Sequence, residues 1–143
     1  MAKRLVWASF DLIRAAIPHI APSGRIINIS SGASRVPNPD GVAFYGASKA
    51  ALESLTRSLA MRYAPSKKLT VNSVVVGPTN TDAAAAFPPE IVKMMADLAT
   101  AEPRIGEPND VASIVSFLAS EESRWINGNS IPADGGASSR RGE

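Results

Sequence analysis

The sequence predicts an α/β protein, a partial doubly wound parallel sheet with flanking helices, and three observations support this fold class. Two short segments, 25–30 and 69–76, are rich in β-branched apolar residues, as buried parallel strands are. Longer segments with helical spacing of apolar residues lie before, between and after them. Stretches rich in Gly, Pro, Ser and Asn separate the two kinds of segment. Strands that alternate with helices of this length form βα units, which build a parallel sheet covered by helices.

The first expected element is a helix over 5–17, followed by a break and then by the strand at 25–30. Small or apolar side chains recur there with helical spacing, at Leu5, Ala8, Leu12, Ala15 and Ala16. Asp11 and Arg14 interrupt the apolar run and no small-residue cleavage site follows it, so this segment is not interpreted as a signal peptide. No stretch of the chain reaches the roughly eighteen apolar residues of a membrane-spanning helix, so no membrane partner is expected.

A loop over 31–41 leads to a second helix, expected from about Tyr45 to Ala64. Its apolar side is predicted at Leu52, Leu55, Leu59 and Met61 or Tyr63. Pro65 would end this helix, because proline lacks the N–H that the helix interior requires. The second strand, at 69–76, follows directly.

The last part of the chain begins with a loop over 77–90. The elements expected after it are a helical segment at 90–101, a helix at 110–123 and a short strand within 128–136. Asn109 or Asp110 is the expected N-cap of the helix at 110–123, since short polar side chains satisfy the first backbone N–H groups of a helix.

Composition narrows the classes of function. Hydrophobic residues make up 45% and charged residues 20%, which is the balance of a globular domain rather than of a disordered chain. The net charge is only +2 and no basic stripe with interleaved aromatic residues is present, so no nucleic-acid partner is expected. The absence of cysteine excludes a disulfide framework and a cysteine-based zinc site, and it fits a reducing compartment such as the cytoplasm. No metal site is expected.

The chain lacks the opening of a complete doubly wound, Rossmann-like nucleotide-binding sheet. No G-x-G-x-x-G or similar glycine cluster joins a first strand to a first helix, and no charged residue follows where one would contact the ribose. A chain of 143 residues is also small for a complete nucleotide-binding enzyme. We therefore expect residues 1–143 to be a single partial domain, the C-terminal portion of such a fold, with the N-terminal nucleotide-binding half missing.

A serine pair and a Tyr–Lys pair are the candidate catalytic residues. Ser30 and Ser31 end the first strand, and residues just beyond the carboxyl ends of strands line the ligand crevice in open α/β sheets. Ser31 precedes Tyr45 by fourteen positions, across the loop that leads into the second helix. Tyr45 and Lys49 are four positions apart, which puts them on one face of that helix. Ser31, Tyr45 and Lys49 can therefore converge at one end of the sheet.

Such a group suits proton exchange with a carbonyl or an alcohol oxygen. A nearby ammonium favours the phenolate form of a phenol, and a phenol assisted in this way can serve as a proton donor or acceptor. A serine hydroxyl can hydrogen-bond the same substrate oxygen and hold it in place. The hydride that moves at carbon must come from a cofactor, because no side chain supplies one. Taken singly, Y-x-x-x-K is a frequent chance pattern and a serine after a strand is more often a cap; their combination in this order is specific.

Four segments in order resemble the short-chain dehydrogenase/reductase family, and together they extend from about Leu5 to Gly136. They are GRIINISSGAS, YGASKAALESLTRSLAMRYA, VNSVVVGPTNTD and RIGEPNDVASIVSFLASEESRWINGNSIPADGG. The pattern is similar to that of the classical branch, which includes 3-oxoacyl carrier-protein reductases and fungal polyketide or naphthol reductases. The fourteen-residue spacing from serine to tyrosine occurs in the fungal naphthol reductases.

The resemblance implies an NAD(P)-dependent oxidoreductase that reduces a ketone or oxidises a secondary alcohol in a small molecule. Tyr45 would be the catalytic acid or base. Lys49 would stabilise the phenolate and bind the nicotinamide ribose, so Tyr45 and Lys49 also belong to the implied cofactor site. Ser31 would orient the substrate oxygen, with its neighbour Ser30 as the alternative.

The segment GPTNT resembles the family's P-G-x-x-x-T turn, which holds the nicotinamide end of the cofactor. Gly77 and Pro78 would shape this turn, Thr79 would offer backbone groups to the carboxamide, and Thr81 would offer a hydroxyl. Val76 stands where the family usually has proline, but Gly77 still permits close backbone approach. The favoured cofactor is NADP, with NAD as the alternative.

The resemblance further implies an assembly and a lid. The helices at 5–17 and 45–64 would pack against another subunit, which gives a homo-oligomer, a dimer or a tetramer. The alanine run at 83–86, followed by Phe87, would form a mobile lid that shapes substrate choice.

Two alternatives to an active enzyme stay open at the level of sequence. Loss of the glycine-rich loop would weaken the grip on the cofactor's phosphates. The family's asparagine that supports a proton-relay water should lie near Lys3 to Leu5, and no Asn occurs there. The chain can therefore be a catalytically weak or inactive paralogue that acts only as a folded or oligomerising remnant, or one half of a split enzyme whose other half is a separate chain.

Overall fold

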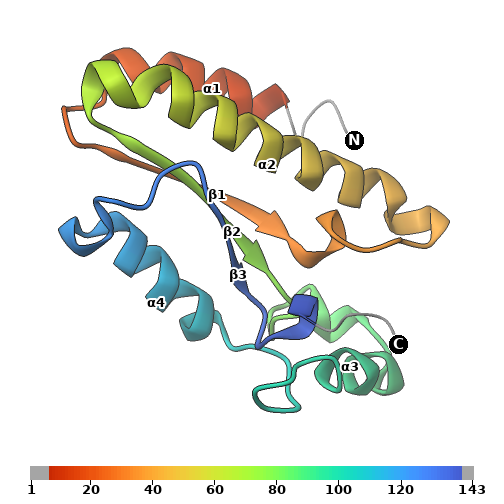
Figure 1. Ribbon diagram of the computed structural model, residues 1–143. Helices are drawn as coiled ribbons and strands as arrows, with labels where there is room; N and C mark the ends of the chain where they lie inside the picture. Colours follow the sequence, from red (N-terminus) through yellow and green to blue (C-terminus); the bar gives the residue numbers. More distant parts are fainter. Residues whose placement is uncertain (1–6, 140–143) are drawn as a thin grey trace.

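The computed structural model describes residues 7–139 and contains a sheet of three parallel strands in the order β1-β2-β3 (Figure 1). The strands are β1 (Arg25–Ser31), β2 (Thr70–Val76) and β3 (Ser130–Ala133). β1 pairs with β2, and β2 pairs with β3 over its second half. This arrangement confirms the predicted α/β class and the predicted positions of the strands.

Helices cover both faces of the sheet, as Figure 1 shows. The helices are α1 (Ala8–Ala16), α2 (Asp40–Lys67), α3 (Pro89–Ala96) and α4 (Pro108–Ala119). α1 and α2 lie on one face, α4 lies on the other, and α3 lies beyond the carboxyl ends of the strands. The connections contain short 3₁₀ turns at Ile17–His19, Gly32–Ser34, Ala84–Ala86, Glu121–Ser123 and Ala137–Ser139. None of the helices within residues 7–139 combines the length and the apolar character that crossing a membrane requires.

The hydrophobic core is centred on β2, the middle strand. Val71, Val74 and Val75 have no exposed surface, as expected for a strand that is covered on both faces. β1 lies at an edge of the sheet, and Ile29 is 46% exposed, so the expectation that the first strand would be fully buried is only partly met. The residues that pack with Val71 in the same cluster are Ile13, Ile17, Leu59, Ala60 and Leu69.

α2 is longer at both ends than the sequence predicts. It begins at Asp40 because Pro39 has an extended backbone that suits the residue before a helix, and it continues past Pro65. Pro65 is tolerated because it lies in the last turn, and the helix ends where Lys68 adopts a left-handed conformation with φ of 53°. Of the two alternatives predicted for the apolar side of α2, Tyr63 packs against the core, whereas Met61 is 79% exposed.

α1 also buries a different set of residues from the one predicted. Leu12 is 70% exposed, whereas Ile13 and Ile17 are buried against α2 and β2. Apolar residues occur on more than one side of this helix, so their spacing alone does not identify the buried face. Leu5, which the prediction included, lies outside the described residues.

α4 begins at Pro108, and its N-cap is Glu107 rather than Asn109 or Asp110. The Asp110 carboxylate instead accepts a hydrogen bond of 2.7 Å from the backbone N–H of Glu107. Asp110 therefore supports the helix start from inside the first turn. The helix ends at Ala119, and Glu121–Ser123 forms a separate 3₁₀ turn instead of continuing it.

Candidate active site

The ends of β1 and β2 meet at one edge of the sheet. The strand register pairs Ser31 with Val76, the last residues of the two strands. The turn that follows Ser31 and the GPTNT segment that begins at Gly77 therefore start side by side. In open α/β sheets, this edge is where ligands bind.

The two serines of the predicted pair have different surroundings. Ser30 is 2% exposed and its hydroxyl donates a 2.7 Å hydrogen bond to Oε1 of Glu53. Ser31 is half-buried and has an extended backbone, and its hydroxyl oxygen accepts a 3.3 Å hydrogen bond from the N–H of Ala33. The Ser30 hydroxyl is engaged in the interior, so the geometry does not favour Ser30 as the alternative to Ser31.

Tyr45 and Lys49 lie together on α2. The Lys49 ammonium is 5.6 Å from the centroid of the Tyr45 ring, and both residues are half-buried. Lys49 Nζ donates a 2.8 Å hydrogen bond to the backbone oxygen of Ile29. Within residues 7–139, the Tyr45 hydroxyl makes no hydrogen bond and Ser31 does not contact it through one.

The Lys49 hydrogen bond lies at the outer edge of β1. The backbone oxygen of Gly24 accepts a hydrogen bond from Thr70 at the start of β2, so Gly24 and every second residue after it direct their backbone groups toward β2. Ile29 lies five residues after Gly24, an odd number, so its carbonyl points to the opposite side, away from β2. Lys49 therefore binds a carbonyl that the described sheet leaves outside its ladder.

The turn after β1 packs closely against α2 at the residue next to Tyr45. Gly46 is buried, and a methyl group there would overlap the backbone oxygen of Ala33 and the side-chain amide of Asn38. Asn38 Nδ2 donates to that same Ala33 oxygen at 2.6 Å and to the Val36 oxygen at 2.9 Å. The turn that starts at Ser31 is therefore held beside the part of α2 that carries Tyr45.

The GPTNT segment is held by its neighbours in a defined conformation. A Cβ on Gly77 would lie 2.7 Å from Cβ of Asp134, so only glycine fits between the ends of β2 and β3. Gly106 donates its N–H to the Pro78 oxygen at 2.9 Å and accepts the Asn80 N–H at 2.7 Å. These bonds flank Thr79, so the N–H and C=O of Thr79 point away from the 106 segment.

The side chain of Thr79 donates a 3.0 Å hydrogen bond to the Gly77 oxygen. Thr81 is exposed, and its backbone oxygen accepts the N–H of Ala84 at 2.8 Å. The Thr81 hydroxyl lies 3.5 Å from the Thr79 oxygen, at the limit of a hydrogen bond. Thr79 thus shapes its own turn, and Thr81 anchors the start of the 3₁₀ turn at Ala84–Ala86.

Sequence reasoning missed Glu53, whose carboxylate contacts three polar side chains at the end of β1 and in the turn after it. Its carboxylate accepts hydrogen bonds from Ser30 at 2.7 Å and from Ser34, and Arg35 lies 3.4 Å away. Burial raises the pKa of the Glu53 carboxyl. The hydrogen bonds from Ser34 and Ser30 and the charge of Arg35 lower it, and together they outweigh burial, so the pKa lies below its usual value. A single glutamate in the run AALESL, four residues after Lys49, is the signal that could have revealed it.

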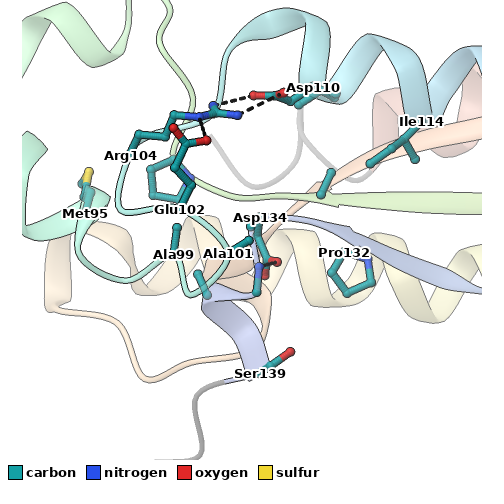
Figure 2. A pocket seen from close by; sticks show the side chains of 17 residues that line it. Met95, Ala99, Ala101, Glu102, Arg104, Asp110, Ile114, Pro132, Asp134 and Ser139 are labelled. Carbon is teal, nitrogen blue, oxygen red and sulfur yellow. Dashed lines mark hydrogen bonds and ion pairs between the residues drawn. The ribbon is translucent and has the colours of Figure 1, made fainter.

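A cavity of about 520 Å³ borders Pro78 of the GPTNT segment and is not lined by Ser31, Tyr45 or Lys49 (Figure 2). Its wall includes Pro78, Met95, Ile114, Pro132 and Asp134. At its rim, Arg104 donates to Asp110 at 2.7 Å and to Glu102 at 2.9 Å, as Figure 2 shows. A smaller hollow of about 300 Å³ is lined by residues of the predicted lid, including Ala84, Ala85 and Phe87.

A family model and individual related proteins both match most of this chain. The family model described as enoyl-(acyl carrier protein) reductase matches residues 5–138. The short chain dehydrogenase penD of Penicillium thymicola is 52% identical over 135 residues, which cover 91% of this chain and 49% of that protein. A protein of Zymoseptoria tritici named "Probable tetrahydroxynaphthalene reductase" is 36% identical over 139 residues, covering 90% of this chain and 52% of that protein.

Solved structures show the same similarity. The angucycline C-6 ketoreductase LanV with bound NADP superimposes with a TM-score of 0.90 and is 38% identical, covering 98% of this chain and 53% of that one. The chain thus spans about half the length of the relatives that it matches. The family model accounts for nearly all of the residues and the parallel sheet agrees with it, so this chain belongs to the short-chain dehydrogenase/reductase family.

Proposed function

We propose that this chain carries the proton-transfer end of an NADP-dependent oxidoreductase that reduces a ketone or oxidises a secondary alcohol, with NAD as the alternative cofactor. One observation carries the proposal. Tyr45 and Lys49 lie together on α2, and the turn after Ser31 packs against α2 at the next residue, Gly46. The relatives named as dehydrogenases and the ketoreductase LanV with bound NADP support this chemistry and this cofactor.

In this proposal each residue has a distinct role. Tyr45 gives a proton to the carbonyl oxygen during reduction, or takes one from the hydroxyl during oxidation. Its hydroxyl makes no hydrogen bond within the described residues and is therefore available to a substrate. Lys49 supplies a positive charge beside the ring, which stabilises the phenolate that remains after proton transfer. Ser31 hydrogen-bonds the substrate oxygen and orients it toward Tyr45.

The residues that would hold the nicotinamide end of the cofactor are Lys49, Gly77, Pro78, Thr79 and Thr81, together with Tyr45. The backbone N–H and C=O of Thr79 fit this role. Pro78 and Asn80, its neighbours, pair with Gly106, so the N–H and C=O of Thr79 point away from Gly106. When bound, the cofactor supplies or accepts the hydride at the carbon atom. The chain's own residues would orient the ring and exchange the proton.

The proposal extends to assembly and location. Large apolar side chains are exposed on α1 and α2, namely Leu12 at 70%, Phe44 at 79% and Met61 at 79%. Exposed apolar surface of this kind supports the predicted homo-oligomer, a dimer or tetramer that uses these two helices. We also propose that residues 1–143 act as one partial domain, that the protein is cytoplasmic, and that the alanine run at 83–86 with Phe87 forms a lid over the substrate.

A second candidate function is a catalytically weak or inactive paralogue that serves only as a folded or oligomerising remnant. The bond between Lys49 and the Ile29 carbonyl is the observation on the side of this candidate, since it gives the ammonium a structural role and uses one of its three N–H donors. The two candidates differ in NADPH binding. An active protein quenches or shifts NADPH fluorescence at micromolar concentrations, whereas a remnant leaves it unchanged.

The test is the rate of NADPH oxidation with a panel of polycyclic aromatic ketones, measured for the natural protein and for Tyr45→Phe. We expect the substitution to lower the rate by about 10²- to 10⁴-fold, the usual contribution of general acid catalysis. The melting temperature should change little, because the Tyr45 hydroxyl has no hydrogen bond within residues 7–139 to lose. An unchanged rate in Tyr45→Phe would exclude Tyr45 from the chemistry.

A further inference from the structure

The last three residues of β1 each form a hydrogen bond with a side chain of α2 or with a side chain that itself contacts α2. Lys49 Nζ donates to the Ile29 oxygen at 2.8 Å. The Ser30 hydroxyl donates to Glu53 Oε1 at 2.7 Å. The backbone oxygen of Ser31 accepts a 2.7 Å hydrogen bond from the Ser34 hydroxyl, which also contacts Glu53 Oε1. Two of these three attachments use a hydroxyl that lies against Glu53 Oε1.

Glu53 is suited to this role by its burial and by its charge balance. It is 7% exposed, and Arg35 places a guanidinium nitrogen 3.4 Å from its second oxygen. The same guanidinium donates a 3.1 Å hydrogen bond to the backbone oxygen of Ser130 at the start of β3. The carboxylate is therefore paired with a cation that is itself anchored to the sheet, which is the condition for keeping a buried charge.

Helix geometry links Glu53 to the candidate catalytic residues. Tyr45, Lys49 and Glu53 are spaced by four residues each, so they follow one another along one side of α2. Tyr45 and Lys49 precede Glu53 on α2, and Glu53 contacts Ser30 and Ser34, on either side of Ser31. A shift of about 1 Å in such an arrangement can lower a rate by about 10²-fold.

We propose that Glu53 is a positioning residue: through Ser30 and Ser34, its carboxylate holds the Ser31 turn in register with Tyr45 and Lys49. This inference rests on the proposed function, because it assigns Glu53 a role in the chemistry of that site. Glu53 does not touch substrate or cofactor, and it acts only through the backbone and hydroxyl of the Ser31 turn.

The experiment compares Glu53→Gln with the natural protein in steady-state ketone reduction. Glutamine keeps the size of the side chain but loses the charge and one acceptor oxygen. We expect kcat to fall at least tenfold while the KM for NADPH stays within twofold. In a Ser31→Ala background, Glu53→Gln should lower kcat by less than twofold further, because a residue that acts through Ser31 has nothing left to position.

Thr56→Val is the matched control. Thr56 is buried on α2, three positions after Glu53, and accepts a 2.9 Å hydrogen bond from Asn28 of β1. Its loss removes an equivalent bond between α2 and β1 without reaching the Ser31 turn. Thr56→Val should lower the melting temperature and leave kcat within twofold.

Hydrogen exchange supplies a readout that does not depend on turnover. The N–H of Ala33 bonds the Ser31 hydroxyl, and the N–H of Arg35 bonds the Gly32 oxygen at 3.0 Å. Glu53→Gln should speed exchange at both amides at least tenfold, and Thr56→Val should not. If Glu53→Gln does not fold, Ser34→Ala replaces it and should produce the same two effects.

The outcomes separate the two proposals. Additive effects of Glu53→Gln and Ser31→Ala, or unchanged exchange at Ala33 and Arg35, would overturn the positioning role. If Tyr45→Phe and Ser31→Ala leave turnover unchanged, the proposed catalytic function fails, and the exchange result still decides whether Glu53 holds the Ser31 turn.

Discussion

Lys49 Nζ donates a 2.8 Å hydrogen bond to the backbone oxygen of Ile29, at the edge of β1 that faces away from β2. The same ammonium lies 5.6 Å from the ring centroid of Tyr45. One side chain therefore connects the edge strand to the candidate proton donor. A lysine in this position can stabilise the fold, the chemistry or both, and substitution separates these contributions.

Lys49→Met should abolish measurable ketone reduction and weaken NADPH binding at least tenfold, because it removes the charge beside Tyr45. Lys67→Met is the matched control, since Lys67 on the same helix donates to the backbone oxygens of Ile17 and Ile20 at 2.6 and 3.1 Å. The control should lose thermal stability but keep NADPH affinity. Steady-state rates, fluorescence titration and thermal melts check both variants, and equal losses of NADPH affinity would contradict a specific role for Lys49.

Gly77→Ala should impair cofactor binding through a steric conflict. The added methyl group would lie 2.7 Å from Cβ and 2.8 Å from Cα of Asp134, so the ends of β2 and β3 must separate. We expect at least a tenfold rise in the Kd for NADPH. Gly41→Ala is the control, because a Cβ there meets nothing within 4 Å, and it should leave the Kd unchanged. Equal Kd values for the two variants would show that the GPTNT conformation does not matter for binding.

Glu53 should make the stability of the fold depend on pH in the acidic range. Its pKa in the folded chain lies below the ordinary 4.5, because the hydrogen bonds from Ser34 and Ser30 and the charge of Arg35 outweigh burial, which alone would raise it. The unfolded chain then takes up the proton at higher pH than the folded chain. The contribution is complete well above pH 4.5 and is lost as the pH falls through the folded pKa.

The measurement is urea unfolding of the natural chain and of Glu53→Gln at several pH values. At pH 7 we expect Glu53→Gln to be less stable by about 1–3 kcal/mol, the usual cost of losing hydrogen bonds to a buried charged group. This difference should shrink as the pH falls below 4.5. With falling pH, the Arg35→Met variant should begin to lose stability at a higher pH than the natural chain does, because Arg35 lowers the pKa of Glu53. A difference that stays constant down to strongly acidic pH would contradict the ionised state of Glu53.

Asp110→Ala should lower the melting temperature, because it weakens the start of α4. Asp110 accepts hydrogen bonds from Arg104 and from the backbone N–H of Glu107, and these hold its pKa below the ordinary value. Glu102→Ala is the matched control, because Glu102 binds the same guanidinium at 2.9 Å but, within residues 7–139, has no hydrogen bond to α4. Thermal melts at pH 7 should show the larger decrease for Asp110→Ala. Equal decreases in melting temperature would mean that Asp110 stabilises the fold through its ion pair with Arg104 and not through the start of α4.

Local sequence patterns predicted those features that depend on neighbours in the chain. The β-branched, largely apolar segment at 69–76 predicted β2, because a strand covered on both faces is rich in such residues. The four-residue spacing of Tyr45 and Lys49 predicted their proximity, since helix geometry alone brings such residues together. The same patterns misplaced the start of α2, because the extended conformation of Pro39 determines it and the apolar spacing begins later.

The sequence by itself determined the α/β class, the order of strands and helices, and the Tyr45–Lys49 pair. Only the tertiary structure decided that Ser30 points into the interior, that Ile13 is buried in place of Leu12, and that Glu53 binds the Ser31 turn. The reason is physical: periodicity specifies which residues share a face of a helix or strand, whereas the packing of distant segments decides which face is covered. Ser30 and Glu53 are 23 positions apart, and no local pattern encodes a hydrogen bond across that distance.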